Sequence, residues 1–217
     1  ATKAVAAWLA GIFFAAGSDP ARPHRACFAI AGASAAGKTK LSIPLRRYLS
    51  DHYAPATLIR RDSFIRDKNS GRRWFDDAAV RTMHQQVIKW LSGEELSGGP
   101  VHLQNVAEAH CPRLPESGLI LIEDLRRMPE FPFSGGICLI GKPAVLTRQE
   151  EKRNGAAWPW WEHWRRNLGK YRYQNYLIRS ILRSGFPWLV LSRDPENGKF
   201  SGWMSAAAKP ISAPELR

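Results

Sequence analysis

Residues 27–39 read Cys-Phe-Ala-Ile-Ala-Gly-Ala-Ser-Ala-Ala-Gly-Lys-Thr, and this stretch decides the fold. Its first part, Cys27 to Ala31, is an apolar run typical of a strand that is buried on both faces. Its second part, Gly32 to Thr39, matches the pattern G-x-x-x-x-G-K-[ST] in full, just before a helix-like segment. The glycines let the backbone wrap a phosphate with its N–H groups pointing inward, at the positive end of a helix dipole. We therefore expect a phosphate-binding loop between a buried strand and a helix.

Two residues of this loop carry its chemistry. The Lys38 ammonium can reach the β- and γ-phosphates of a nucleotide, and the Thr39 hydroxyl can ligate Mg²⁺. ATP and Mg²⁺ are therefore the expected cofactors. The residues expected to bind the nucleotide are Gly32, Ala33, Ser34, Ala35, Ala36, Gly37, Lys38 and Thr39.

Outside the loop, short apolar runs alternate with helix-length segments. The apolar runs are residues 27–31, 57–59, 119–122, 137–140 and 188–191, and the main helical segments are 38–49, 78–91, 144–153 and 161–183. This alternation predicts an α/β protein with a three-layer P-loop NTPase fold. We expect a five-stranded, mostly parallel sheet with helices on both faces and a helical lid.

The chain's length and composition fit one globular domain spanning residues 1–217. With 217 residues, 44% of them hydrophobic and 24% charged, disorder and collagen-like repeats are excluded. The net charge of +13 indicates a surface that attracts polyanions, without saying which. Cys27 and Cys138 lie in apolar runs and predict buried free thiols in a reducing, cytoplasmic location. No apolar run is long enough to predict a membrane span.

Three segments flank or interrupt the sheet pattern. Ala4 to Gly17 superficially suggests a signal peptide, but its apolar residues recur at helical spacing, so a packed helix is favoured. The lid is expected at about residues 143–172. The Ala/Ser/Pro-rich end, from about residue 200 to 217, is expected to be a loosely held tail.

Acidic residues follow two of the predicted strands. Asp62 comes just after the second strand, where it would overhang the crevice at the carboxyl ends of the strands. There it could accept the proton of an attacking hydroxyl or help to hold the metal. Glu123 and Asp124 end the third strand, and either could serve Mg²⁺; Glu123 is preferred because it continues the strand.

Five stretches taken together resemble the uridine kinase/phosphoribulokinase family of small-molecule kinases. They are GASAAGKT (32–39), DSFIRD (62–67), WFDDAA (74–79), PVHL (100–103) and LILIED (119–124). The resemblance implies a P-loop kinase that transfers the γ-phosphoryl group of ATP to a hydroxyl, with Asp62 as the catalytic base. It also implies that Asp76 holds the acceptor's hydroxyls, although Asp76 could equally cap the helix that begins near residue 78. Phe64, His102 and His110 are the further candidates for acceptor contacts.

The sequence departs from the family mainly on the acceptor side. Ile65 stands where the family has Tyr, Asp124 stands where it has Gly after the acidic residue, and His102 replaces a nucleoside-contacting Tyr. Phosphoryl transfer is therefore better supported than uridine as acceptor. In the family's lid, arginines neutralise the transferred phosphate, and Arg148 and Arg153 are the candidates here.

A Trp- and Arg-rich segment, residues 158–173, leaves other functions open. Interleaved aromatics and arginines can stack on bases, or can anchor a long helix in the core. We expect a kinase whose acceptor is a small nucleoside-like, sugar or antibiotic-type molecule, and a homodimer is compatible with the sequence. The alternatives are a nucleic-acid-binding P-loop ATPase, which is less favoured, and a toxin-like kinase of sugar nucleotides.

Overall fold

The computed structural model describes residues 2–16, 24–60, 65–66, 74–75, 77–94, 114–123, 131–194 and 200–204. The helices are α1 (Thr2–Ala16), α2 (Lys38–His52), α3 (Asp77–Ser92), α4 (Pro143–Asn154) and α5 (Trp160–Arg183). The strands are β1 (Arg25–Gly32), β2 (Ala56–Arg60), β3 (Ile65–Arg66), β4 (Trp74–Phe75), β5 (Gly118–Glu123), β6 (Gly135–Ile140), β7 (Trp188–Arg193) and β8 (Phe200–Met204). Every predicted strand and helix is present, with ends that differ by a few residues at most.

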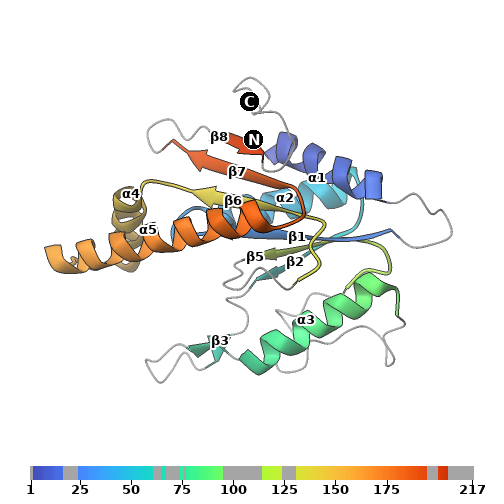
Figure 1. Cartoon of the computed structure of the whole chain (residues 1–217), viewed down its shortest axis with the longest axis horizontal. Coiled ribbons are helices and arrows are strands. Elements are labelled where there is room, and N and C mark those ends of the chain that lie inside the picture. The colour runs from blue at the N-terminus through green and yellow to red at the C-terminus, as the bar shows by residue number, and fades with distance from the viewer. Residues whose placement is uncertain are drawn as a thin grey trace.

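A six-stranded sheet in the order β2-β5-β1-β6-β7-β8 forms the middle of the molecule (Figure 1). β2, β5, β1, β6 and β7 are mutually parallel, as predicted, whereas β8 pairs antiparallel with β7. The expectation of a loose tail from about residue 200 is therefore wrong for Phe200–Met204. These five residues form hydrogen-bonded pairs with the open edge of β7, whose backbone groups would otherwise lack partners there. β3 and β4 form a separate antiparallel pair.

Helices cover both faces of the sheet, which gives three layers (Figure 1). On one face, apolar residues of α1 and α2 pack on β1, with Leu9 and Leu45 fully buried against Phe28 and Ile30. On the other face, Val87 and Trp90 of α3 and Leu177 and Ile181 of α5 join the strand residues that point that way. Neighbouring residues of β1 alternate between the two cores, because successive side chains of a strand point to opposite faces.

Two features of the helices bear on the sequence predictions. Val5, Leu9 and Phe13 of α1 are buried, so residues 2–16 form the packed helix that was favoured. Pro44 lies inside α2, and the helix continues through it to His52, with Pro44 exposed. Within the described ranges, no helix combines the length and the apolar character needed to cross a bilayer.

Candidate active site

The phosphate-binding motif forms a tight turn between β1 and α2. Gly32 has φ of 152°, and a Cβ there would lie 2.6 Å from the carbonyl oxygen of Leu139 in neighbouring β6. Gly37 precedes α2 with φ of 92°, and Ala35 has φ of 66° although it is not glycine. Left-handed conformations at non-glycine residues cost free energy and concentrate at ligand-binding sites. The positive φ angles explain why both motif positions are glycine, and the close approach of Leu139 adds to the reason at Gly32. The backbone at Ala35 is strained.

Lys38 and Thr39 begin α2, and their side chains make different contacts. The Lys38 Nζ donates to the carbonyl oxygens of Gly32 and Ala33, at 2.8 and 3.2 Å, so the ammonium lies inside the loop. The Thr39 hydroxyl donates to Glu123 Oε1 at 2.7 Å. This places the carboxylate at the end of β5 directly behind the loop, where the sequence predicted an acidic partner of the metal.

The Glu123 carboxylate is buried and is contacted by residues of two elements, α2 and β2. Its second oxygen, Oε2, accepts a hydrogen bond from Ser42 of α2 at 2.7 Å, and the Arg60 Nε of β2 lies 3.5 Å from the same oxygen. Glu123 itself is only 5% exposed. Parallel pairing sets Arg60 and Ile30 beside Glu123, so all three strands end at the same edge.

These residues fit a Mg²⁺–nucleotide complex. Mg²⁺ is usually held by one or two protein oxygens together with phosphate oxygens and water. The Thr39 hydroxyl, backed by Glu123, supplies such an oxygen at the start of a helix, and Lys38 supplies the compensating positive charge. When bound, the metal would neutralise negative charge on the phosphates.

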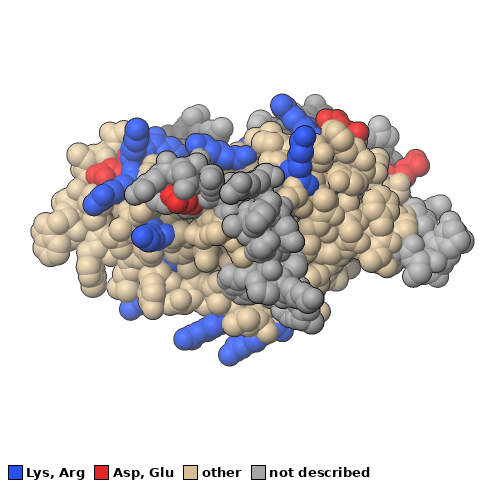
Figure 2. All heavy atoms as spheres, turned by 90° about the horizontal axis from the view of Figure 1, so that it is seen from above, with Lys and Arg blue, Asp and Glu red and all other residues tan. Residues whose placement is uncertain are grey.

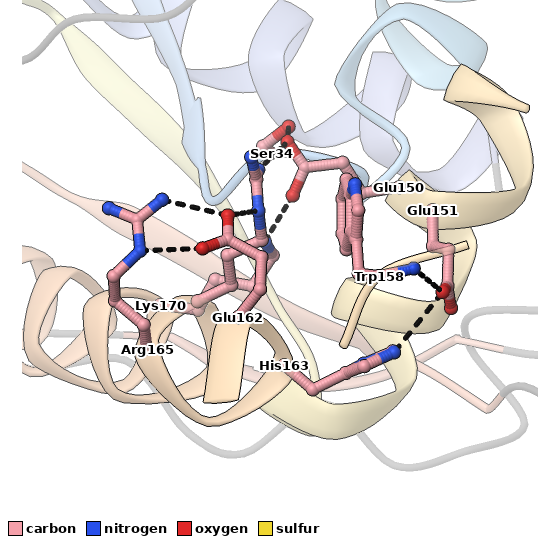
Figure 3. A network of polar contacts seen from close by, with 9 residues as sticks. Ser34, Glu150, Glu151, Trp158, Glu162, His163, Arg165 and Lys170 are labelled. Carbon is pink, nitrogen blue, oxygen red and sulfur yellow. Dashed lines mark hydrogen bonds and ion pairs between the residues drawn. The ribbon is translucent and has the colours of Figure 1, made fainter. Parts of the chain in front are cut away.

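The lid reaches the loop through a buried carboxylate of α4 (Figure 3). Glu150 Oε1 accepts a hydrogen bond from the Ser34 hydroxyl at 3.1 Å, while Oε2 accepts one from Lys170 of α5. Arg166 Nη1 lies 3.4 Å from Glu150 Oε1. Burial alone would raise the pKa of Glu150, but the hydrogen bond and charge of Lys170, with smaller contributions from Ser34 and Arg166, bring it below its ordinary value. The carboxylate is thus charged and fixed between lid and loop.

A cavity of about 300 Å³ lies where the lid meets the loop. Two loop residues and six residues of α4 and α5 line it: Ala33, Ser34, Glu150, Arg165, Arg166, Gly169, Lys170 and Tyr173. Three cations and one carboxylate line the space beside the loop, and a second carboxylate, Glu162, pairs with two of the cations. Such a space favours a ligand with negative charge.

A second set of contacts fixes the two lid helices relative to each other (Figure 3). Glu151 accepts hydrogen bonds from the backbone N–H of Trp158 at 2.7 Å and pairs with His163 at 3.2 Å. The Arg166 guanidinium lies over the Trp158 ring, 3.9 Å from its centroid. The Trp158 N–H is the main reason why the pKa of Glu151 is lowered, partly offset by desolvation. These contacts tie the start of α5 to the end of α4.

The predicted catalytic and substrate residues divide into two groups. Asp62, Phe64, Asp76, His102 and His110 lie outside the described residues, as does the alternative metal residue Asp124. Their assigned roles remain predictions. Every predicted nucleotide-binding residue and Glu123 are brought together at one edge of the sheet.

The two candidate lid arginines differ in their placement. Arg153 Nη2 lies 3.4 Å from the Ser34 hydroxyl, so this side chain touches the loop. Arg148 is exposed, and its charge acts on Glu151, where it helps to lower the pKa of that carboxyl. The structure thus places Arg153, and not Arg148, in contact with the loop.

Sequence reasoning missed several residues of the site. Ser42 follows Thr39 by three positions on a helix, so its side chain shares that face, and this spacing could have revealed it. Glu150 and Lys170 are 20 positions apart on different helices, and only the fold of the lid joins them. Arg166 was noted only as part of the Trp- and Arg-rich segment. No sequence pattern pointed to a carboxylate above the loop.

The loop, the buried acidic partner and the sheet order together define an α/β protein with the three-layer fold of P-loop kinases. A protein proposed to be the kinase of a fructose transport system in Silicibacter sp. TM1040 superposes with a TM-score of 0.51 and 20% sequence identity, covering 79% of this chain and 94% of that one. The YGR205w protein gives a TM-score of 0.47 and 13% identity, covering 93% and 95%. No protein-family model matches the sequence, and no curated protein matches it. At 20% identity, the similarity to the first of these structures supports the fold and leaves the substrate open.

Proposed function

We propose that this protein is a kinase that transfers the γ-phosphoryl group of ATP to a hydroxyl of a small molecule, with Mg²⁺ as the metal. The observation that carries the proposal is the hydrogen bond from Thr39 to Glu123 behind the loop. If the loop were only a glycine-rich turn and Lys38 had no role, a buried carboxylate at Glu123 that accepts from the Thr39 hydroxyl would not be needed. The fold of the structural neighbour proposed to be a fructose transport system kinase supports the same class of reaction.

Each residue has a role in this proposal. The backbone of residues 32–39 would hold the nucleotide's phosphates, Lys38 would neutralise the β- and γ-phosphates, and Thr39 would present its hydroxyl to the metal. The acceptor oxygen forms a bond to phosphorus as the bond to the β–γ bridging oxygen breaks, and Asp62 receives the hydroxyl proton. Lid cations would stabilise the charge that spreads over the transferred group.

The lid residues suited to that task are those on the loop side. Arg153 contacts Ser34, while Arg166 and Lys170 line the adjacent cavity. We infer that these three side chains, more than the exposed Arg148, face the transferred phosphate. The acceptor classes that we propose are nucleoside-like compounds, sugars and antibiotic-type molecules. The buried free thiols of Cys27 and Cys138 fit a reducing compartment such as the cytoplasm.

An ATP-consumption screen against nucleosides, sugars, sugar phosphates and aminoglycoside-like compounds tests the proposal. The active acceptor should be phosphorylated by the wild type, and Lys38→Met should reduce kcat by about 100-fold or more because electrostatic stabilisation of the transition state is lost. Asp62→Ala should remove transfer yet retain ATP binding by calorimetry. Lys152→Met, at an exposed site on α4, is the control. Absence of heat from ATP with Mg²⁺ in the wild type would refute the proposal.

A further inference from the structure

α5 presents a row of exposed aromatic side chains to solvent. Trp160, Trp164 and Tyr171 are 80%, 64% and 57% exposed. At 100° per residue they lie within about 40° of one another around the helix axis, so they share one face. Large aromatic side chains are seldom left so exposed without a partner, and the proposed phosphoryl transfer uses none of the three.

A row of arginines runs beside these aromatics. Arg172, Arg179 and Arg183 are exposed residues of α5 and recur within about 40° of one another, roughly 100° around the axis from the aromatic row. Arg165 shares this row but is paired with Glu162. The buried residues of α5, among them Lys170 and Ile181, lie on the opposite side. Figure 2 shows that Lys and Arg also outnumber Asp and Glu on the side of the whole molecule seen from above. The outer face of α5 is therefore aromatic along one row and positively charged along the next.

The aromatic row lies on the part of α5 that extends beyond the sheet. α5 has 24 residues and is about 36 Å long, whereas the 6 residues of β7 span about 20 Å. The last turns of α5 pack on the sheet through Leu177 and Ile181, close to where β7 begins. The first turns consequently overhang the edge at which the phosphate loop lies, and in Figure 1 one end of α5 projects past α4. The residues that form this surface all belong to α5.

We propose that the outer face of α5 is a binding surface for single-stranded nucleic acid. Aromatic side chains stack on bases of any sequence, and neighbouring arginines pair with the phosphates between them. A helix that inserts into a lipid surface carries Trp, Phe and Leu on one face and Lys and Arg on the opposite, polar face. On α5 the arginine row lies only about 100° from the aromatic row, and Leu182, which shares the aromatic face, lies three turns beyond Tyr171. Stacking therefore fits this surface better than insertion.

Fluorescence anisotropy with a labelled oligothymidylate of about 20 nucleotides tests the proposal in the absence of ATP. We expect the wild type to bind, and Trp164→Ala to raise Kd about five- to 150-fold because one stacked base is lost. Arg172→Gln and Arg179→Gln should each make the slope of log K against log salt concentration less negative by about 0.7. These substitutions are at exposed positions, which leaves the core unchanged.

Matched controls lie on other helices. Phe14 of α1 is 54% exposed, and Arg81 of α3 is exposed, so Phe14→Ala and Arg81→Gln should leave Kd within about twofold. Absence of binding at low salt, or binding that Trp164→Ala leaves unchanged, overturns the proposal. Binding of phosphatidylglycerol vesicles that depends on Trp164, without oligonucleotide binding, would assign the surface to a membrane and also overturn it. Because ATP is absent, none of these results bears on the proposed kinase activity.

Discussion

The ion pair between Glu150 and Lys170 should contribute strongly to stability when one partner alone is removed. The two side chains are 11% and 9% exposed, and Lys170 Nζ donates directly to Glu150 Oε2. Glu150→Leu leaves the Lys170 ammonium buried beside Arg166 without their shared carboxylate. Breaking a buried pair in this way costs about 3–5 kcal/mol. We take about 3 kcal/mol for each single variant, Glu150→Leu and Lys170→Met, because Arg166 keeps its contact with Glu162.

The double variant, Glu150→Leu with Lys170→Met, should lose little stability. With leucine and methionine facing each other, no charge is buried, and replacing a pair by apolar residues of similar volume is often neutral or stabilising. The double variant should therefore lie within about 1 kcal/mol of the wild type. Because the two single losses of about 3 kcal/mol each are replaced by a double loss of at most about 1 kcal/mol, the two substitutions couple by about 5 kcal/mol.

Urea unfolding followed by circular dichroism measures all four proteins of this cycle. For a chain of 217 residues, a loss of about 3 kcal/mol corresponds to a fall in Tm of about 6–12 °C. Lys152→Met removes an exposed lysine of α4 and should change stability by less than about 0.5 kcal/mol. Single losses below about 1 kcal/mol, or losses that simply add in the double variant, would refute the reasoning, since they would show a solvated surface pair.

Three further outcomes are expected. Gly136→Ala places a Cβ 2.3 Å from the Trp188 ring, so it should destabilise the protein by about 1–3 kcal/mol, measured by thermal unfolding. Burial raises the pKa of Cys27 well above its usual range and that of Cys138 to about 12, so both thiols should resist alkylation, followed by mass spectrometry, until the protein unfolds. The hydrogen bond from Arg165 lowers the pKa of Glu162 to about 2 from an ordinary value of 4.5, so its stabilising effect is present above pH 4.5 and lost as pH falls toward 2; an NMR titration midpoint near 4.5 would contradict this.

Much of the fold could be predicted because its signals are local. The apolar run of β1 and the glycines of the loop occupy consecutive positions, and their conformations follow from sterics and burial within a few residues. Glu123 was predicted on similar grounds, because an acidic residue after a buried strand ends at the ligand-binding edge of a parallel sheet. β8 was missed because Phe200–Met204 is short and contains Ser and Gly, and because its pairing depends on the open edge of β7.

The sequence by itself determined the class of fold, the position of the phosphate loop and the strand end, with Glu123 preferred over Asp124, that supplies its acidic partner. Those features depend on short-range backbone preferences and on hydrophobic burial, which the order of residues encodes directly. The tertiary structure alone decided that Glu150 reaches Ser34 across 116 positions and that Lys170 meets Glu150 from another helix. It also decided which face of α5 remains open to solvent. Such contacts depend on how helices cross and on which rotamers fit between them, and pairs so distant in the chain leave no periodic signal.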